Sequence, residues 1–227
     1  MSKKLLIFGN GEIASIAYNC FVKYTKYKID GFIVDEFANN QKTFLDKKLI
    51  NIKDIGNYPP KEYDIFIAIS YRKLNRIREE KYNYFKNKKY DFANFIHPEN
   101  HIDDNVKIGK NVFILQNQTI QNDVILGDNV MIWSSNHIGH GSIIGNHTYV
   151  SSHVTISGHC KIGERVFFGV NSCVADFCNI ENDCFIGMSC SVGKNIKSGT
   201  YSVNKNTEFF EKDHKISKMI QKKYFQF

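Results

Sequence analysis

An apolar residue recurs at every sixth position between Ile102 and Val192, sixteen times without an insertion or a missed step. With 42% of the chain apolar, such a run arises by chance roughly once in a million trials. A period of six fits neither an amphipathic helix, at 3.6, nor a simple alternating strand, at 2. These anchor positions are Ile102, Ile108, Ile114, Ile120, Leu126, Ile132, Ile138, Ile144, Val150, Ile156, Ile162, Phe168, Val174, Ile180, Ile186 and Val192.

The period predicts a hexapeptide β-solenoid, in which three short strands and their corners make a triangular coil of eighteen residues. The anchors then point inward and stack on the anchor eighteen residues away, one strand spacing of about 4.8 Å along the axis. Glycine often follows the anchor, as at Gly109 and Gly127, where a Cβ would clash or require positive φ. Known solenoids of this pattern wind left-handed. We therefore expect an all-β left-handed parallel β-helix.

The first ninety or so residues predict a separate, Rossmann-like α/β domain. An apolar run at residues 4–8 ends in Gly9-Asn10-Gly11 and is followed by a helical pattern through Phe21, the opening of a nucleotide-binding βαβ unit. A second buried strand, Ile29–Val34, ends in Asp35-Glu36, where such units bind ribose hydroxyls. The domain is short for a full dinucleotide fold, which favours one mononucleotide-like ligand over NAD.

A third predicted strand, residues 64–69, leads into Ser70-Tyr71-Arg72 and a basic helix over residues 74–87. Carboxyl ends of parallel strands border the ligand crevice of open α/β sheets. Tyr71 is therefore placed to stack on a base and Arg72 to meet a phosphate, although both also suit a solvated first helical turn. A last strand over 92–96 precedes the hinge at Pro98.

We expect three regions: the α/β domain (1–97), the solenoid (98–200) and a tail (201–227). In the tail, residues 198–207 are predicted to be irregular and residues 213–224 to be helical. One face of this helix carries Ile216, Met219, Ile220 and Tyr224. We expect that face to pack over the end of the solenoid and protect its last strand edge.

Charge and cysteines narrow the functional classes. The net charge of +7 suits anionic ligands such as nucleotides or coenzyme A, and it equally suits a Lys-rich solvated surface. No basic stripe accompanies a nucleic-acid-binding module. Five of the six cysteines lie in the repeat and are expected to be buried small hydrophobes in a reducing compartment. No run resembles a signal peptide or a membrane span, so we expect a cytoplasmic protein.

His140 is the strongest catalytic candidate. It lies two positions after the anchor Ile138, facing outward among small residues, where no packing role explains it. A histidine there can accept a proton near pH 7. His147 and His159 are expected to be solvated surface residues. No two histidines are spaced five apart, as in solenoid carbonic anhydrases, so no metal is expected.

Several segments together resemble a known family. The glycine loop, the end of the second strand and the solenoid are similar to the bacterial sugar acyltransferases. These include the sialic acid O-acetyltransferases and the bacillosamine-pathway N-acetyltransferase. The most specific segments are Asn136–His140, Ile156–Gly158 and Phe168–Val174. The resemblance covers about residues 3–205.

The resemblance implies a homotrimer with acetyl-CoA bound between adjacent solenoids and no metal. It implies direct N-acetylation of a nucleotide-linked amino-deoxysugar, a UDP- or dTDP-linked 3- or 4-amino-dideoxyhexose, for bacterial glycan or O-antigen synthesis. His140 would be the base, and the Gly158 N–H would bind the thioester oxygen. The expected coenzyme contacts are Asn136, Tyr149, Gly158 and Asn171. The expected acceptor contacts are Gly9, Asn10, Gly11, Asp35, Glu36, Ser70, Tyr71 and Arg72.

Two alternatives stay open: O-acetylation of a sugar such as sialic acid, and a non-catalytic trimeric binding platform. The chain also departs from the family in two places. The residue after the catalytic histidine is often Glu or His, and here it is Gly141. Any acid that orients His140 must therefore come from elsewhere. The usual Gly-x-Pro-Ala-Lys ending is also absent.

Overall fold

Apolar strands alternating with helices build a mostly parallel sheet at the N-terminus of the computed structural model, which describes residues 3–37, 41–205 and 208–225. The strand order is β3-β4-β2-β1-β5-β6, and only β3 and β4 pair antiparallel. The elements are β1 (Lys4–Phe8), α1 (Glu12–Tyr24), β2 (Ile29–Val34), β3 (Thr43–Phe44), β4 (Lys47–Asn51), the 3-10 helix η2 (Ile52–Asn57), β5 (Tyr63–Ile67), α2 (Arg76–Asn87) and β6 (Asp91–Phe92).

The three continuous apolar runs form β1, β2 and β5, as predicted, and they are the central strands. Their side chains are buried on both sides of the sheet because α1 covers one face and α2 the other. The short β3–β4 pair at the sheet edge was not predicted from the sequence. It has no long apolar run to mark it.

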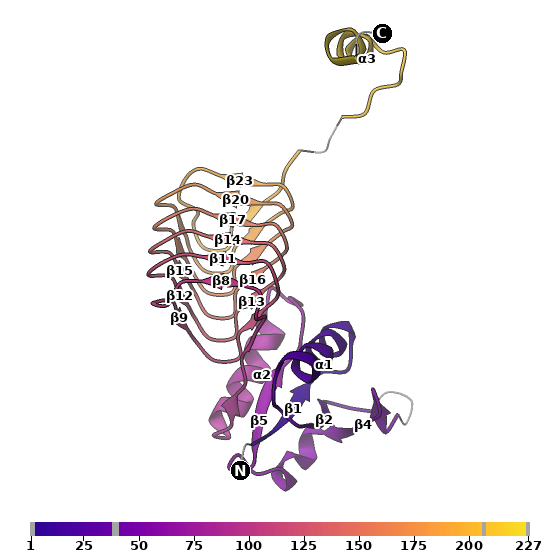
Figure 1. The fold of residues 1–227 in the computed structure, drawn as a ribbon, viewed down its shortest axis with the longest axis vertical. Helices are drawn as coiled ribbons and strands as arrows, with labels where there is room; N and C mark the ends of the chain where they lie inside the picture. Colours follow the sequence, from indigo (N-terminus) through magenta and orange to yellow (C-terminus); the bar gives the residue numbers. More distant parts are fainter. Residues whose placement is uncertain (1–2, 38–40, 206–207, 226–227) are drawn as a thin grey trace.

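Residues 95–202 form the predicted left-handed parallel β-helix, with two-residue strands stacked into three faces (Figure 1). Face one contains β7 (Phe95–Ile96), β10 (Phe113–Ile114), β13 (Met131–Ile132), β16 (Tyr149–Val150), β19 (Phe167–Phe168), β22 (Phe185–Ile186) and β24 (Tyr201–Ser202). Face two contains β8 (His101–Ile102), β11 (Thr119–Ile120), β14 (His137–Ile138), β17 (Thr155–Ile156), β20 (Cys173–Val174) and β23 (Ser191–Val192). Face three contains β9 (Lys107–Ile108), β12 (Ile125–Leu126), β15 (Ile143–Ile144), β18 (Lys161–Ile162) and β21 (Asn179–Ile180).

The period of eighteen sets the strand register throughout. Ile114 pairs with Ile132, and Ile132 with Val150, so the anchors stack in ladders inside the coil and form its core. The glycine after an anchor has a steric role: a Cβ on Gly109 would lie 2.6 Å from the Gly127 carbonyl oxygen of the next coil.

Positive φ falls at another step of the repeat, three residues after the anchor. Fourteen consecutive corners, from Asn111 (φ 56°) to Ser189 (φ 56°), have this left-handed conformation. Most of these positions carry Asn, Asp, Ser or His rather than an aliphatic side chain, in keeping with the cost of αL for bulky residues. His147, His153 and His159 all occupy this step, which accounts for their spacing of six.

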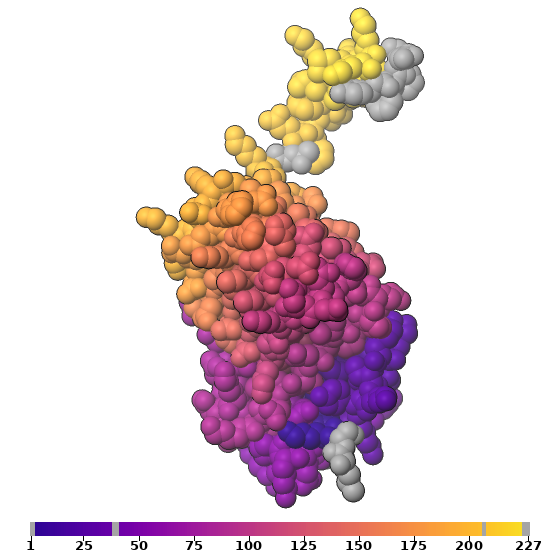
Figure 2. Space-filling view, turned by 60° about the vertical axis from the view of Figure 1, so that its left-hand side comes forward, coloured from indigo at the N-terminus to yellow at the C-terminus, as the bar shows by residue number. Residues whose placement is uncertain are grey.

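The α/β domain and the solenoid share an apolar core. Phe66 of β5 packs against Phe113 of face one with ring centroids 5.4 Å apart, and Phe21 of α1 packs against Phe95 at 5.6 Å. The space-filling view shows the two regions in continuous contact, whereas the tail stands away from them (Figure 2). A core of this kind holds the two regions in one fixed relation.

The structure corrects two expectations about segment ends. Residues 92–96 form no single strand, because β6 pairs with β5 in the α/β sheet while Phe95–Ile96 is already in the solenoid. Tyr201–Ser202 pairs with β22, so part of the segment expected to be irregular adds a rung. Residues 206–207 of that segment lie outside the described residues.

The predicted tail helix forms, as α3 (Lys215–Ile220) continued by a π-helix over Gln221–Phe225. It does not pack on the solenoid. No residue of α3 is buried, and Met219 and Ile220 of the predicted packing face are exposed. The side chain of Tyr224 lies outside the described residues. The last rung is therefore left uncovered by this helix (Figure 1).

The cysteines follow the repeat with one exception. Cys160, Cys178, Cys184 and Cys190 are buried, as expected, whereas Cys173 points outward and is exposed. Within the described ranges, no helix is long and apolar enough to cross a membrane.

Candidate active site

His140 lies on the corner between faces two and three, which we call the His140 corner (residues 121–123, 139–141, 157–159 and 175–177). Its side chain is exposed, as predicted. Gln121, one coil below, contacts it twice: Gln121 Oε1 accepts from the His140 backbone N–H at 3.0 Å and lies 3.2 Å from His140 Nδ1. The opposite ring nitrogen, Nε2, is left free of this contact.

Gly158 lies against the other side of the imidazole. A Cβ at this position would stand 2.8 Å from His140 Cε1 and 3.0 Å from Nε2, so only glycine leaves room for the ring. The Gly158 N–H donates to Asp176 Oδ1 at 2.9 Å. A thioester oxygen at this N–H would therefore have to displace the carboxylate.

A short aromatic stack borders His140. The His159 ring meets the His140 ring edge-on, with centroids 4.8 Å apart, and stacks on Phe177 at 5.2 Å. Phe177 is 74% exposed. His159 is exposed, as predicted from the sequence, and the stack gives it a definite place beside His140.

The predicted acceptor site is a crevice at the carboxyl ends of β1 and β5. Five of the predicted contacts line it: Gly9, Asn10, Gly11, Ser70 and Arg72. Gly9 has φ 120°, and a Cβ there would lie 2.7 Å from the Ala68 carbonyl oxygen. Gly11 is the N-cap of α1, without a side-chain cap and with open space around its Cα. The first turn of α1 therefore presents free N–H groups, which suit a phosphate.

Three other predicted acceptor residues do not line this crevice. Tyr71 is half-exposed and rests on the outward rings of face one, 5.0 Å from Tyr149 and 4.7 Å from Phe167 between centroids. Asp35 forms an ion pair of 2.6 Å with Lys81 of α2. Glu36 is exposed beside it.

The predicted coenzyme residues are spread over other parts of the solenoid. Asn136 is buried, donates to the Trp133 carbonyl and accepts from the Val154 N–H, so its amide is used inside the coil. Tyr149 is buried beneath the α/β domain, and burial raises its pKa to about 12. Asn171 is exposed on the corner between faces one and two, one coil from His153 as expected.

The segment after the crevice makes a strained turn. Lys73, Leu74 and Asn75 have φ of 50°, 50° and 65°, a conformation that costs about 1–2 kcal/mol per non-glycine residue. Asn75 is fully buried and holds the turn: its N–H donates to the Tyr71 carbonyl at 3.0 Å, and its Oδ1 accepts from Arg78 Nη2 at 2.9 Å.

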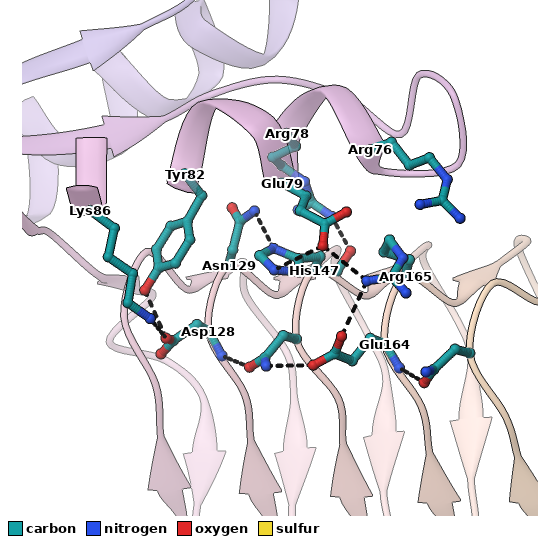
Figure 3. A network of polar contacts seen from close by, with 12 residues as sticks. Arg76, Arg78, Glu79, Tyr82, Lys86, Asp128, Asn129, His147, Glu164 and Arg165 are labelled. Carbon is teal, nitrogen blue, oxygen red and sulfur yellow. Dashed lines mark hydrogen bonds and ion pairs between the residues drawn. The ribbon is translucent and has the colours of Figure 1, made fainter. Parts of the chain in front are cut away.

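Arg78 of α2 connects this turn to the solenoid at the corner between faces three and one. We call it the α2 corner (residues 110–111, 128–129, 146–148, 164–165 and 182–183). Arg78 is completely buried, and its Nη2 donates to the His147 carbonyl at 2.6 Å (Figure 3). Burial lowers the pKa of Arg78 to about 9. Its guanidinium carbon stands 5.8 Å from the Tyr149 ring centroid.

A chain of buried amides crosses the α2 corner. The Ile67 N–H at the end of β5 donates to Asn111 Oδ1 at 2.7 Å, and Asn111 Nδ2 donates to Asn129 Oδ1 at 2.7 Å. Asn129 Nδ2 then faces His147 Nδ1 at 2.8 Å. Each hydrogen bond fixes the orientation of the next amide, so Asn129 Nδ2 donates to His147 Nδ1. Because Nδ1 accepts, it carries no proton, and the His147 ring is neutral.

The expectation of a solvated His147 is therefore wrong. The side chain is 6% exposed, and burial, reinforced by the Arg78 charge, lowers its pKa to about 4. The repeat alone could not show this, because the covering helix α2 comes from a distant part of the sequence.

Ion pairs and a phenol complete the contact with α2 (Figure 3). Tyr82 donates to Asp128 Oδ2 at 2.7 Å. Arg165 pairs with Glu79 at 2.9 Å and with Asp183 at 2.8 Å. Together with His147, the solenoid partners Asp128, Arg165 and Asp183 occupy four successive coils at the same two steps of the repeat, so α2 lies along the solenoid axis.

The structure thus brings together two sets of predicted residues: His140 with Gly158, and the glycine loop with Ser70 and Arg72. It does not bring the sets to each other within one chain, since the crevice lies beside face one. Gln121 and Asp176 were missed, although counting in coils of eighteen marks both as neighbours of this corner. Among the described residues, no group of three or more His, Cys, Asp or Glu side chains is placed to hold a metal.

Comparison with known proteins supports the repeat and the fold. The model of the bacterial transferase hexapeptide family (six repeats) matches residues 123–158. A search of curated protein sequences finds no match.

Solved structures match over nearly the whole chain. The acetyltransferase domain of PglB from Neisseria gonorrhoeae FA1090, in complex with acetyl coenzyme A, has a TM-score of 0.78 at 18% identity, covering 88% of this chain and 96% of that one. PerB from Caulobacter crescentus, in complex with CoA and GDP-perosamine, has a TM-score of 0.77 at 19% identity, covering 89% and 93%. The fold, α/β domain included, is shared with these proteins, in line with the predicted resemblance to bacterial sugar acyltransferases.

Proposed function

We propose that the protein is an acetyl-CoA-dependent N-acetyltransferase acting on a nucleotide-linked amino-deoxysugar. The observation that carries the proposal is the exposed His140, held at Nδ1 by Gln121 and with Nε2 beside Gly158. The similar proteins bound to acetyl coenzyme A, or to CoA and GDP-perosamine, supply the substrate class. The net charge of +7 suits both anionic substrates.

In the proposed reaction the sugar amine attacks the acetyl carbonyl, so a C–N bond forms and the C–S bond breaks. His140 Nε2 takes the proton that the amine loses. The Gly158 N–H stabilises the oxyanion once the Asp176 carboxylate has moved aside. The thiolate of coenzyme A leaves and is then protonated, with no covalent enzyme intermediate.

The acceptor is proposed to bind in the crevice lined by Gly9, Asn10, Gly11, Ser70 and Arg72, with its phosphates at the first turn of α1. Tyr71 is held on face one, whereas His140 lies on the opposite edge of the triangular coil, between faces two and three. The crevice of one chain therefore needs the His140 corner of another. This favours the proposed homotrimer, with acetyl-CoA lying between neighbouring solenoids and contacting Asn171.

The test is a substrate panel. The purified protein is mixed with acetyl-CoA and with UDP-, dTDP- or GDP-linked amino-deoxysugars, and free thiol and product mass are followed. We expect thiol release with one amino sugar and a product heavier by one acetyl group. Release on sialic acid alone would replace the proposal with O-acetylation. Silence with every acceptor, together with no thermal stabilisation by acetyl-CoA, would favour a non-catalytic platform.

A further inference from the structure

We infer that Gln121 is a positioning residue for His140, fixing the ring tautomer in which Nε2 carries the free lone pair. The inference rests on the proposed function only for its kinetic consequence. Gln121 takes the place of an acidic partner for His140, which the chain lacks at Gly141.

The first step is the orientation of the amide. A backbone N–H can only donate, so the atom of Gln121 that meets the His140 N–H at 3.0 Å is the carbonyl oxygen. The same oxygen lies 3.2 Å from His140 Nδ1. Because this oxygen has no proton to give, Nδ1 must carry the hydrogen, and in the neutral ring Nε2 is then the acceptor.

The second step explains why Gln121 meets this N–H. At four other corner positions, the equivalent N–H donates to a side chain from the following coil. The donor–acceptor pairs are Lys110 to Asp128, Asp128 to Asn146, Gly158 to Asp176 and Glu164 to Asn182. For His140 the following residue is Gly158, which has no side chain. Gly158 thus admits the imidazole and leaves the N–H to Gln121.

The third step concerns the size of the side chains that stack on Gln121 in the following coils. The residues stacked above Gln121 on this corner are Gly139, Ser157, Ala175 and Gly193, all small. Gly139 has no space for a Cβ, which would lie 2.6 Å from the Gly158 nitrogen. A long polar side chain occurs only one coil below His140, where it reaches the ring.

Two titratable side chains of the described residues lie beside the His140 ring. They are His159, edge-on at 4.8 Å between centroids, and Asp176, which accepts from the Gly158 N–H. The atom that orients the ring, Gln121 Oε1, belongs to a neutral amide. It selects the tautomer without stabilising the protonated imidazole as a carboxylate does.

The first test needs no substrate. In ¹⁵N-histidine-labelled protein, long-range ¹H–¹⁵N spectra report which ring nitrogen is protonated, and His140→Asn assigns the signals. We expect the Nδ1–H tautomer in the wild type and a shift toward Nε2–H in Gln121→Leu. An Nε2–H tautomer in the wild type, or identical spectra in the variant, would overturn the inference even if acetyl transfer is confirmed.

The kinetic test uses Gln121→Leu and Gln121→Glu, with thermal unfolding as the control for folding. Gln121→Leu should lower kcat about tenfold without changing KM for acetyl-CoA. In Gln121→Glu the acid limb of the pH–rate profile should move to higher pH, because the carboxylate stabilises the protonated ring. Equal losses in both variants with an unmoved limb would mean a merely structural role. If Gln121→Leu does not fold, Gln121→Glu and the spectra decide.

Discussion

The His140 corner and the α2 corner have the same backbone but opposite surroundings. At the same step of the repeat, His159 is exposed on the first and His147 is buried on the second. His147 accepts the last hydrogen bond of a directional amide chain and has a pKa lowered to about 4 by burial. His140, at a different step, has its Nδ1 held and its Nε2 side open. The positive-φ step of the repeat explains His147, His153 and His159, whereas His140 lies one residue before that step.

The two corners also differ in what they contact. The α2 corner joins the strained turn of residues 73–75 to the solenoid through Arg78, which fixes the loop that borders the proposed acceptor crevice. On the His140 corner, by contrast, His140, His159 and Phe177 are exposed. The same repeating backbone therefore forms a buried, rigid contact at the α2 corner and a solvent-accessible surface at the His140 corner.

Among changes that leave the His140 side chain in place, the largest effect should come from filling the space beside its ring. Gly158→Ala places a methyl group 2.8 Å from Cε1 and 3.0 Å from Nε2, which forces the ring away from its position. Displacing a catalytic group by about 1 Å costs about 10²-fold, so kcat for acetyl transfer should fall by that order. The matched control is Gly193→Ala, where a Cβ meets nothing within 4 Å. Equal activity of the two variants would show that the ring position is unimportant.

The buried histidine should appear in the pH dependence of stability. The unfolded chain takes up a proton at His147 near pH 6.5, whereas the folded protein does so only near pH 4. The contribution of His147 to the free energy of unfolding is therefore constant above pH 6.5. As the pH is lowered from 6.5 to 4, this contribution falls by up to about 1.4 kcal/mol per pH unit.

His147→Asn should remove this slope from urea unfolding measured between pH 7.5 and 4.5. Asparagine tolerates the positive φ and keeps a polar group in place. His153→Asn, at an exposed corner with φ 59°, should leave the slope as it is. If His147→Asn and the wild type lose stability in parallel, the buried neutral histidine is refuted.

The smallest effect tests the contact between α2 and the solenoid. Tyr82→Phe removes the hydrogen bond to Asp128 and should lower the free energy of unfolding by about 1–2 kcal/mol, because a carboxylate loses a partner. Tyr84→Phe, on the same helix, should change it by less than about 0.5 kcal/mol. A larger loss for Tyr84 would contradict the assignment of α2 to this corner.

Much of the fold followed from the sequence because the period fixes the register. Anchors such as Ile138 and Ile156 had to stack, and the outward position of His140 followed from its distance from an anchor. Contacts within one corner were within reach of the same counting, including Gln121 and Asp176. Contacts between distant segments were not: nothing local marks Arg78 as buried, or the tail helix as standing off the last coil.

The most direct test of the account measures His140→Asn and His147→Asn side by side, using the amino sugar found by the panel. We predict that His140→Asn loses between about 10² and 10⁴ of kcat with an unchanged unfolding transition at pH 7. His147→Asn should keep kcat within about threefold of the wild type while changing the pH dependence of unfolding. A His140→Asn protein that transfers acetyl groups at the wild-type rate would contradict the assignment of the base.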